Sequence, residues 1–323
     1  MHRRTLLAAA ALALPASLTL AQDGWPTRTV RLVVPAPPGS SLDIVARLLG
    51  DKLKDRWGAS VVVENKPGAG GLLGMDAAAK APPDGHVLAL GFNGPVAFAP
   101  FMYAKLPYDP ARDLAPVVMT TSQPNVLAVN AALPVKTVAE FVAWARERNG
   151  RMNYASLGKG SSSHLTMELL MAEARFQGTH VPFNGSPPSA MSVAQGETDA
   201  TLMVAPALLP HVRAGRVRLL AVTSRQRLEG LRDVPTLAEA GFPGVNALAW
   251  NGLFTAAGTP EDVVRRINAD VNAVLQDAGV RVALEQQGLT PVGGSAAVFR
   301  ELVAAETQRW GTIIRRIGLR LEP

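Results

Sequence analysis

Short apolar and β-branched runs alternate with longer stretches of helical periodicity along most of this chain. The short runs predict strands at 30–34, 60–64, 86–90, 117–120, 126–129, 152–155, 180–182, 201–204 and 218–222. Residues 42–56 place apolar side chains at helical spacing, and further helices are expected between the other strands. Strands and helices in alternation are typical of a parallel α/β architecture.

Two helices are predicted near the carboxyl end. The segment Thr259-Pro260-Glu261-Asp262 supplies an N-cap, a first-turn proline and acidic residues. Apolar residues follow it at four-residue spacing, at Val263, Ile267, Val271 and Leu275. A second helix is expected to start at Ser295 and to break near Gly311.

The first residues predict an export signal. A charged start at residues 2–4 precedes an apolar run, and small residues stand three and one before a cut after Ala21. We expect residues 1–21 to be removed as a signal peptide, leaving a mature chain that starts near Gln22. The pair Arg3-Arg4 also fits a twin-arginine signal, although the ordinary secretory route is favoured. No later stretch offers the roughly 20 apolar residues of a membrane helix, so a soluble exported protein is expected.

Composition narrows the possible functions. Removal of the signal takes away two arginines and lowers the formal net charge from +6 to +4. No run of basic residues accompanies this mild surplus, so nucleic acid is not expected as a partner. The chain contains no cysteine, which excludes thiolate catalysis. Its length is enough for two lobes.

Two loops between a strand and a helix have the composition of anion sites. Residues 35–43 run Pro-Ala-Pro-Pro-Gly-Ser-Ser-Leu-Asp, and residues 156–163 run Ser-Leu-Gly-Lys-Gly-Ser-Ser-Ser. The first amide N–H groups of a helix lack partners within it, and together with the helix dipole they suit a carboxylate or a phosphate. Two such loops in separate halves would clamp one anion. A simpler interpretation stays open, in which Ser41 or Asp43 only caps its own helix.

Motifs spread over nearly all of the mature chain occur together in one family. They are Trp25-Pro26, Asn65-Lys66-Pro67-Gly68-Ala69-Gly70-Gly71, Leu106-Pro107-Tyr108-Asp109-Pro110, Tyr154-Ala155-Ser156 with Gly158 and Gly160, His180-Val181-Pro182, Asp233-Val234-Pro235-Thr236 and Pro291-Val292-Gly293-Gly294. In this order they make the chain resemble the Bug family, the TctC-like extracytoplasmic solute receptors of tripartite tricarboxylate transporters.

The resemblance implies a type II periplasmic-binding-protein fold. In this α/β fold, crossing strands join two α/β lobes, and the ligand binds in the cleft between them. Lobe 1 is expected at 22–124 plus 226–323, and lobe 2 at 125–225. The implied function is that of a periplasmic, monomeric receptor that captures a small organic carboxylate for the membrane subunits of the transporter. No enzyme activity, cofactor or metal is implied.

Members of the family hold the ligand carboxylate through backbone amides, hydroxyls and bridging waters of both loops. Carried over by position, the ligand-binding residues are Gly39, Ser40, Ser41 and Asp43 in the first loop and Ser156, Gly160, Ser161 and Ser162 in the second. Ser40 stands where the family more often has glycine. Asn93 occupies a position that is often polar at the pocket edge, although it also fits a turn.

Val204 is the remaining ligand-binding candidate. Relatives often carry Phe-Asp-Asn where this chain has Met203-Val204-Ala205, and their aspartate lies near the cleft. Without that carboxylate a buried ligand ammonium lacks its counter-charge, so an acid without an amino group is expected. Its apolar body would pack against Met203, Val204, Phe183 and Trp250. Val204 also fits a plain core position in a strand.

Three other functions were weighed against the receptor. A hydrolase is disfavoured because no serine stands in a Gly-x-Ser-x-Gly elbow, and Ser161 to Ser163 beside His164 fit the start of a helix. A dinucleotide site would use the glycines of 68–74, but the third glycine comes one place late. A receptor of the same fold that signals to a membrane sensor stays open as an alternative.

Overall fold

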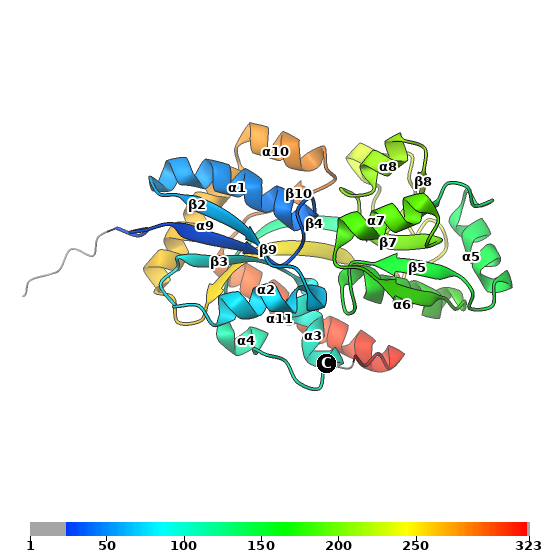
Figure 1. Cartoon of the computed structure of the whole chain (residues 1–323), viewed down its shortest axis with the longest axis horizontal. Helices are drawn as coiled ribbons and strands as arrows, with labels where there is room; N and C mark the ends of the chain where they lie inside the picture. The colour runs from blue at the N-terminus through cyan, green and yellow to red at the C-terminus, as the bar shows by residue number, and fades with distance from the viewer. Residues whose placement is uncertain (1–23, 322–323) are drawn as a thin grey trace, which may run out of the picture.

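The structure is a computed structural model that describes residues 24–321. The predicted signal peptide at 1–21 and the predicted start at Gln22 lie outside the described residues. Two α/β bodies lie side by side and are joined by two long strands (Figure 1).

The first body is built on three parallel strands. β1 (Val30–Val34) lies between β2 (Val61–Asn65) and β3 (Val87–Phe92) and pairs with both. Its longer helices are α1 (Ser41–Trp57), α2 (Leu72–Ala79), α9 (Glu261–Leu275), α10 (Ala278–Glu285) and α11 (Ala296–Ile317). Its short elements are η1 (Ala69–Gly71), η2 (Gly94–Phe98), α3 (Ala99–Met102), α4 (Pro110–Asp113) and β10 (Thr290–Pro291).

β4 (Leu114–Asn130) and β9 (Leu248–Ala256) connect the two bodies. β9 pairs antiparallel with β3 and with Leu114–Pro124 of β4, whereas Asn125–Asn130 of β4 pair with strands of the second body. One sheet of ten strands therefore runs through the molecule. It is mixed rather than wholly parallel, because the connecting strands run against their neighbours.

The second body repeats the parallel arrangement. β5 (Asn153–Ser156) lies between β6 (Thr179–Pro182) and β7 (Ala200–Val204) and pairs with both in parallel. β8 (Val217–Val222) pairs antiparallel with β4. Its helices are α5 (Val138–Glu147), α6 (Ser162–Ala174), α7 (Ser186–Gln195), α8 (Leu209–Arg213) and η3 (Glu229–Leu231).

Each body has its own buried core. Leu49 of α1 and Ile267 of α9 pack on the sheet of the first body, and Trp310 of α11 belongs to a second cluster there. In the second body Phe141 and Leu170 belong to a separate cluster. The periodic apolar positions of the helices thus face the sheet. The loops that follow the strand ends stay outside these cores, on the surface between the two bodies.

The connecting strands differ from the prediction. The strands expected at 117–120 and 126–129 are parts of the single strand β4. β9 was not predicted, because Asn251 and Gly252 interrupt its apolar run.

The two late helices also differ in detail. α9 begins at Glu261 with Pro260, not Thr259, in the N-cap position. α11 runs through Gly311 without the predicted break. A Cβ at Gly311 would lie 2.5 Å from the ring of Phe101. Glycine therefore allows close packing here and does not end the helix.

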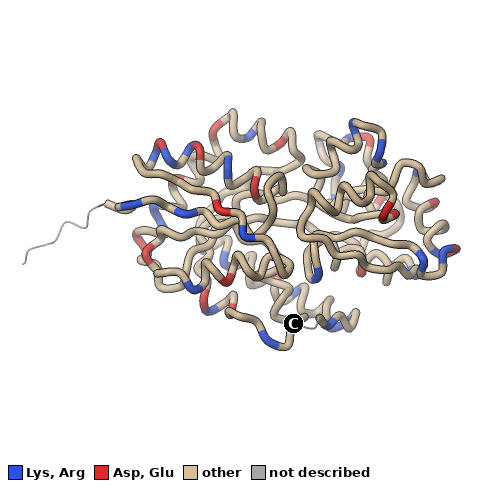
Figure 2. Tube along the Cα trace, in the orientation of Figure 1, with Lys and Arg blue, Asp and Glu red and all other residues tan. Residues whose placement is uncertain are grey.

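Charged residues of both signs are interspersed over both bodies (Figure 2). Such a distribution favours a solvated surface over a nucleic-acid footprint. Within residues 24–321 no helix combines the length and the apolar character of a membrane span.

Candidate functional site

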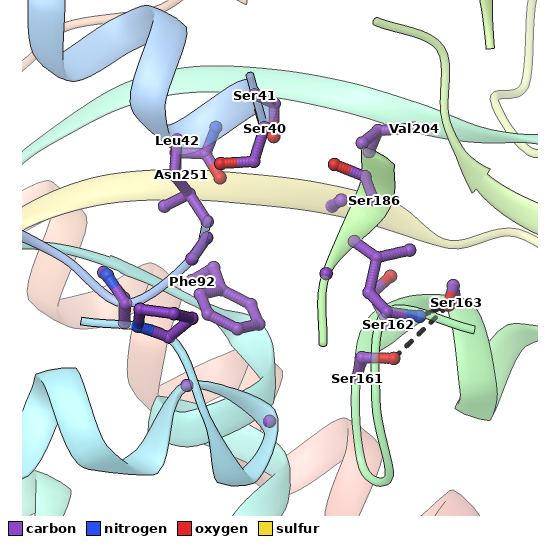
Figure 3. A pocket seen from close by; sticks show the side chains of 18 of the residues that line it. Ser40, Ser41, Leu42, Phe92, Ser161, Ser162, Ser163, Ser186, Val204 and Asn251 are labelled. Carbon is purple, nitrogen blue, oxygen red and sulfur yellow. Dashed lines mark hydrogen bonds between the residues drawn. The ribbon is translucent and has the colours of Figure 1, made fainter. Parts of the chain in front are cut away.

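One pocket is lined by loops and strand ends of both bodies. Its volume is about 640 Å³ when the open solvent at its mouth is included. No Lys, Arg, Asp, Glu or His is found among the described residues that line it. Figure 3 shows Ser40, Ser41 and Asn251 on one side of the pocket and Ser161 and Val204 on the other. A carboxylate would be held here by neutral donors.

The amino terminus of α1 forms one wall. Gly39 turns the chain with a positive φ of 77°, and Ser40 then caps the helix by accepting the amide N–H of Asp43. Ser40, Ser41 and Leu42 line the pocket. The first amides of a helix have no partner within it, so this wall presents N–H donors and the positive end of the helix dipole.

The amino terminus of α6 forms the opposite wall. Ser161 caps this helix by accepting the amide N–H of His164, and its hydroxyl donates to the Gly158 carbonyl at 2.7 Å. The hydroxyl of Ser163 accepts the amide N–H of Leu157 at 3.0 Å, which holds the loop against the helix. Because Ser161 to Ser163 line the pocket, a second set of helix N–H donors faces the same space as the first.

The predicted ligand-binding residues fall into two groups. Those that line the pocket are Ser40, Ser41, Asn93, Ser161, Ser162 and Val204. Those that are not among its lining residues are Gly39, Asp43, Ser156 and Gly160. The two glycines shape the loops instead, with positive φ angles of 77° and 74°. Ligand binding by any of these residues remains a prediction.

Asp43 holds the first loop together behind the pocket wall. Its carboxylate accepts hydrogen bonds from the Gly39 amide at 2.9 Å, from Arg47 Nε at 3.0 Å and from Asn65 Nδ2 at 3.0 Å. Burial raises the pKa of this carboxyl, but the bonds from Arg47, Gly39 and Asn65 outweigh burial and leave its pKa below the ordinary value. The simpler interpretation, a cap by Ser41 or Asp43, is therefore replaced by a cap from Ser40.

Ser156 belongs to a buried cluster next to the second loop. Its hydroxyl lies 2.6 Å from Nε2 of His180, and the His180 ring stacks on His164 with centroids 3.8 Å apart. Nδ1 of His164 accepts the amide N–H of Gly160 at 3.1 Å. Burial, with smaller contributions from His180 and Lys159, lowers the pKa of His164 to about 3. Burial together with Lys159 lowers the pKa of His180 to about 4. Both rings are neutral at pH 7, and His164 supports the loop as an acceptor.

This pairing of serine and histidine was not predicted, because the sequence shows His180 as an isolated residue. The pair does not form an accessible nucleophile: Ser156 is fully buried and does not line the pocket. In the part of the chain that the structure describes, no three His, Cys, Asp or Glu side chains are grouped to hold a metal ion.

The loops of the two bodies touch around the pocket. A Cβ at Gly70 would lie 2.6 Å from the carbonyl oxygen of Lys159, and a Cβ at Gly185 would lie 2.4 Å from Cδ of Pro37. Both glycines have positive φ angles, of 63° and 109°. Only glycine permits such a close approach, so these contacts bring the two bodies together beside the pocket.

Amide and hydroxyl side chains that were not predicted complete the polar lining. Gln123, Asn125 and Asn251 come from the connecting strands β4 and β9, and Ser186 begins α7. All four are almost completely buried. The one signal that marks them in the sequence is a polar residue inside or next to an apolar run, since a buried amide needs a partner.

The apolar lining differs from the expected set. Val204 and Phe92 line the pocket, whereas Met203, Phe183 and Trp250 do not. Neighbouring residues of a strand point to opposite faces, so Val204 faces the pocket while Met203 packs in the core. Trp250 belongs to a core cluster of the first body.

Comparison with known families and proteins gives consistent matches. The model of the tripartite tricarboxylate transporter family receptor matches residues 45–319. A UPF0065 protein from the tcbD-tcbE intergenic region of Pseudomonas sp. (strain P51) is 40% identical over 315 residues, 97% of this chain and 94% of that protein. The protein BugT of Bordetella pertussis (strain Tohama I) is 35% identical over 317 residues, 98% of this chain and 96% of BugT.

Solved structures share the whole fold. Rpa4515 of R. palustris, solved with adipate, is 36% identical with a TM-score of 0.89 and covers 93% of this chain and 100% of its own. MatC of Rhodopseudomonas palustris, solved with bound malate, is 34% identical with a TM-score of 0.85 and covers 90% and 100%. The periplasmic binding protein BugD is 26% identical with a TM-score of 0.88 and covers 93% and 100%. The predicted two-lobed periplasmic-binding-protein fold is thereby confirmed.

Proposed function

The chain belongs to the receptor family of tripartite tricarboxylate transporters, and from this premise we propose that it captures a small organic carboxylate between its two lobes for uptake. Receptors of this family are periplasmic solute-binding proteins.

The observation that carries the proposal is a pocket between two helix amino termini, with no charged side chain among the described residues that line it. α1 and α6 come from different lobes, and both begin at the pocket with serine caps. A helix amino terminus stabilises a nearby anion by about 0.3–2 kcal/mol, and each hydrogen bond to a charged group adds about 1.5–3 kcal/mol of stabilisation. Two termini acting together therefore favour an anion, and the planar oxygens of a carboxylate suit paired N–H and O–H donors.

The apolar lining supports an organic acid over an inorganic anion. Phe92, Leu42 and Val204 offer carbon surface beside the polar donors. Burial of this apolar surface favours binding only when the ligand covers it with a carbon skeleton. The related structures solved with adipate and with malate support the same ligand class.

We further propose that the lobes close on the ligand by hinge motion. Of the expected division into 22–124 plus 226–323 and 125–225, we keep the first boundary, so that one hinge falls between Pro124 and Asn125 of β4. The change of pairing partners of β4 at this point supports the placement. The second boundary is placed after η3, because Leu231 packs against the core of the second body. We also propose that residues 1–21 are removed on export, and that the mature protein acts without a cofactor, as a monomer and not as an enzyme. In this proposal it delivers the ligand to the membrane subunits of a tripartite transporter.

Calorimetry with matched acids and amides tests this function. Succinate and adipate should bind, and their diamides should bind at least about tenfold more weakly, because the helix termini favour a negative charge. Ser161→Ala removes a cap and a hydroxyl at the pocket and should weaken binding severalfold or more. Ser295→Ala is the matched control, because Ser295 caps α11 without lining the pocket. Equal affinities for acid and amide would contradict the proposal.

A further inference from the structure

Several buried polar atoms of the pocket lack a protein partner. Among the described residues, Oδ1 of Asn93, Oε1 of Gln123 and Oγ of Ser186 are buried without a hydrogen bond. All three side chains line the pocket and are at most 1% exposed. Buried polar atoms are normally paired, so unpaired ones that gather at a ligand site indicate what the ligand supplies.

A hydrogen bond from the amide nitrogen of Asn93 shows that its amide oxygen is the atom that faces the pocket without a partner. Its Nδ2 donates to the Leu248 carbonyl at 3.1 Å, and a carbonyl accepts only from a donor, so the amide nitrogen must lie on that side. Oδ1 of Asn93 is therefore the atom that lacks a partner.

Asn125 is fixed in the same way from the connecting strand β4. Its Nδ2 lies 3.0 Å from Oγ1 of Thr166, and Thr166 donates its own proton to the Ser162 carbonyl at 2.6 Å. Oγ1 of Thr166 is therefore an acceptor toward Asn125, which leaves Oδ1 of Asn125 without a protein donor. The pocket thus contains two amide oxygens that can accept and cannot donate.

A plain carboxylic acid does not match these two oxygens. Carboxylate oxygens are acceptors and are served by the helix termini of α1 and α6. An ammonium group is a donor, but no Asp or Glu is found among the described lining residues to balance its charge. A hydroxyl group is a neutral donor, and its oxygen can accept in turn from the hydroxyl of Ser186.

We propose that the pocket selects a carboxylic acid that also carries a hydroxyl group, with the O–H donated to Oδ1 of Asn93 or Asn125. This inference rests on the proposed function and names the ligand subclass. Removing the ligand hydroxyl should leave the amide oxygen that accepts from it unpaired and weaken binding about tenfold.

Calorimetry with pairs that differ by one hydroxyl tests the inference. The pairs are malate with succinate and 2-hydroxyadipate with adipate. We expect the hydroxy member of the better-binding pair to bind about tenfold tighter than its partner, and aspartate to bind more weakly than malate. Asn93→Leu or Asn125→Leu should remove most of the hydroxyl preference, because one of them removes the oxygen that accepts the ligand O–H. Asn246→Leu is the matched control, because this asparagine does not line the pocket and should leave the preference unchanged.

The outcomes separate the inference from the function on which it rests. Hydroxy acids that bind no tighter than plain acids, or aspartate that binds tighter than malate, would overturn the inference and leave carboxylate binding intact. A hydroxyl preference that survives in both Asn93→Leu and Asn125→Leu would also overturn it. Failure of all these acids to bind would overturn the proposed function as well. Urea unfolding shows whether each variant is folded.

Discussion

The stacked histidines next to the second loop predict that mild acid destabilises the folded protein. His164 is 3% exposed, and burial lowers its pKa to about 3, below the roughly 6.5 of an unfolded chain. As the pH falls below about 6.5, the unfolded chain takes up a proton at this site and the folded protein does not. The stability that neutral, buried His164 contributes is therefore fully present above about pH 6.5 and is lost progressively toward about pH 3. A proton on Nδ1 would also end its hydrogen bond from Gly160.

The size of the effect follows from the pKa values. Between pH 7 and pH 5 the unfolded chain gains nearly one proton at His164, which lowers the free energy of unfolding by about 2 kcal/mol. His180 is partly exposed, so we add at most about 1 kcal/mol for it. Burial raises the pKa of Glu168, which accepts a hydrogen bond from Tyr154, and this shift works in the opposite direction.

Urea unfolding of wild type and His164→Asn at pH 7, 6 and 5 measures the effect. Asparagine keeps an acceptor close to the position of Nδ1 and removes the titrating group. Wild type should lose about 2 kcal/mol more than the variant between pH 7 and pH 5. Apart from His180 and Glu168, which contact His164, all other groups titrate alike in both proteins, so most of the difference reports on His164. A difference that does not change with pH, or that moves in favour of wild type in acid, would refute the reasoning.

Two further substitutions probe the pocket. Gly70→Ala should weaken ligand binding about tenfold by keeping the lobes apart, because its Cβ would lie 2.6 Å from the Lys159 carbonyl. Calorimetry measures the affinity, and urea unfolding shows whether the variant is folded. Gly215→Ala is the matched control, because Gly215 has a similar φ of 67° and a Cβ there would have nothing within 4 Å. An equal loss of affinity in this control would count against closure of the lobes. Val204→Asp places a carboxylate in the pocket and should reverse the order of thermal shifts, raising that of aspartate and lowering that of succinate. An unchanged order would mean that Val204 does not face the ligand.

Local patterns carry the parts of this protein that can be predicted from its sequence. Serines precede α1 and α6, and a helix cap involves only residues that are close in sequence. In the structure Ser40 caps α1 and Ser161 caps α6. The strand and helix runs of both lobes follow from the same short-range periodicity. Only the family motifs predicted how these elements assemble into two lobes joined by crossing strands.

The remaining site residues depend on pairing between distant segments. Asn251 reaches the pocket because β9 inserts between β3 and β4, and its own sequence is too irregular to predict a strand. His180 meets His164 only because β6 lies beside β5. Gly311 lies inside an unbroken helix because its place is set by close packing against the Phe101 ring, which is distant in sequence. None of these contacts leaves a periodic signal in the sequence.

Native mass spectrometry of the protein isolated from the periplasm tests the central claim most directly. We expect wild type to carry one small organic acid per chain, or to take up one added dicarboxylate. Ala249→Trp, which places an indole in the pocket lining, should carry none while it keeps a folded charge-state distribution. A wild-type protein that neither carries nor takes up an acid, or a folded variant that retains it, would contradict binding in this pocket.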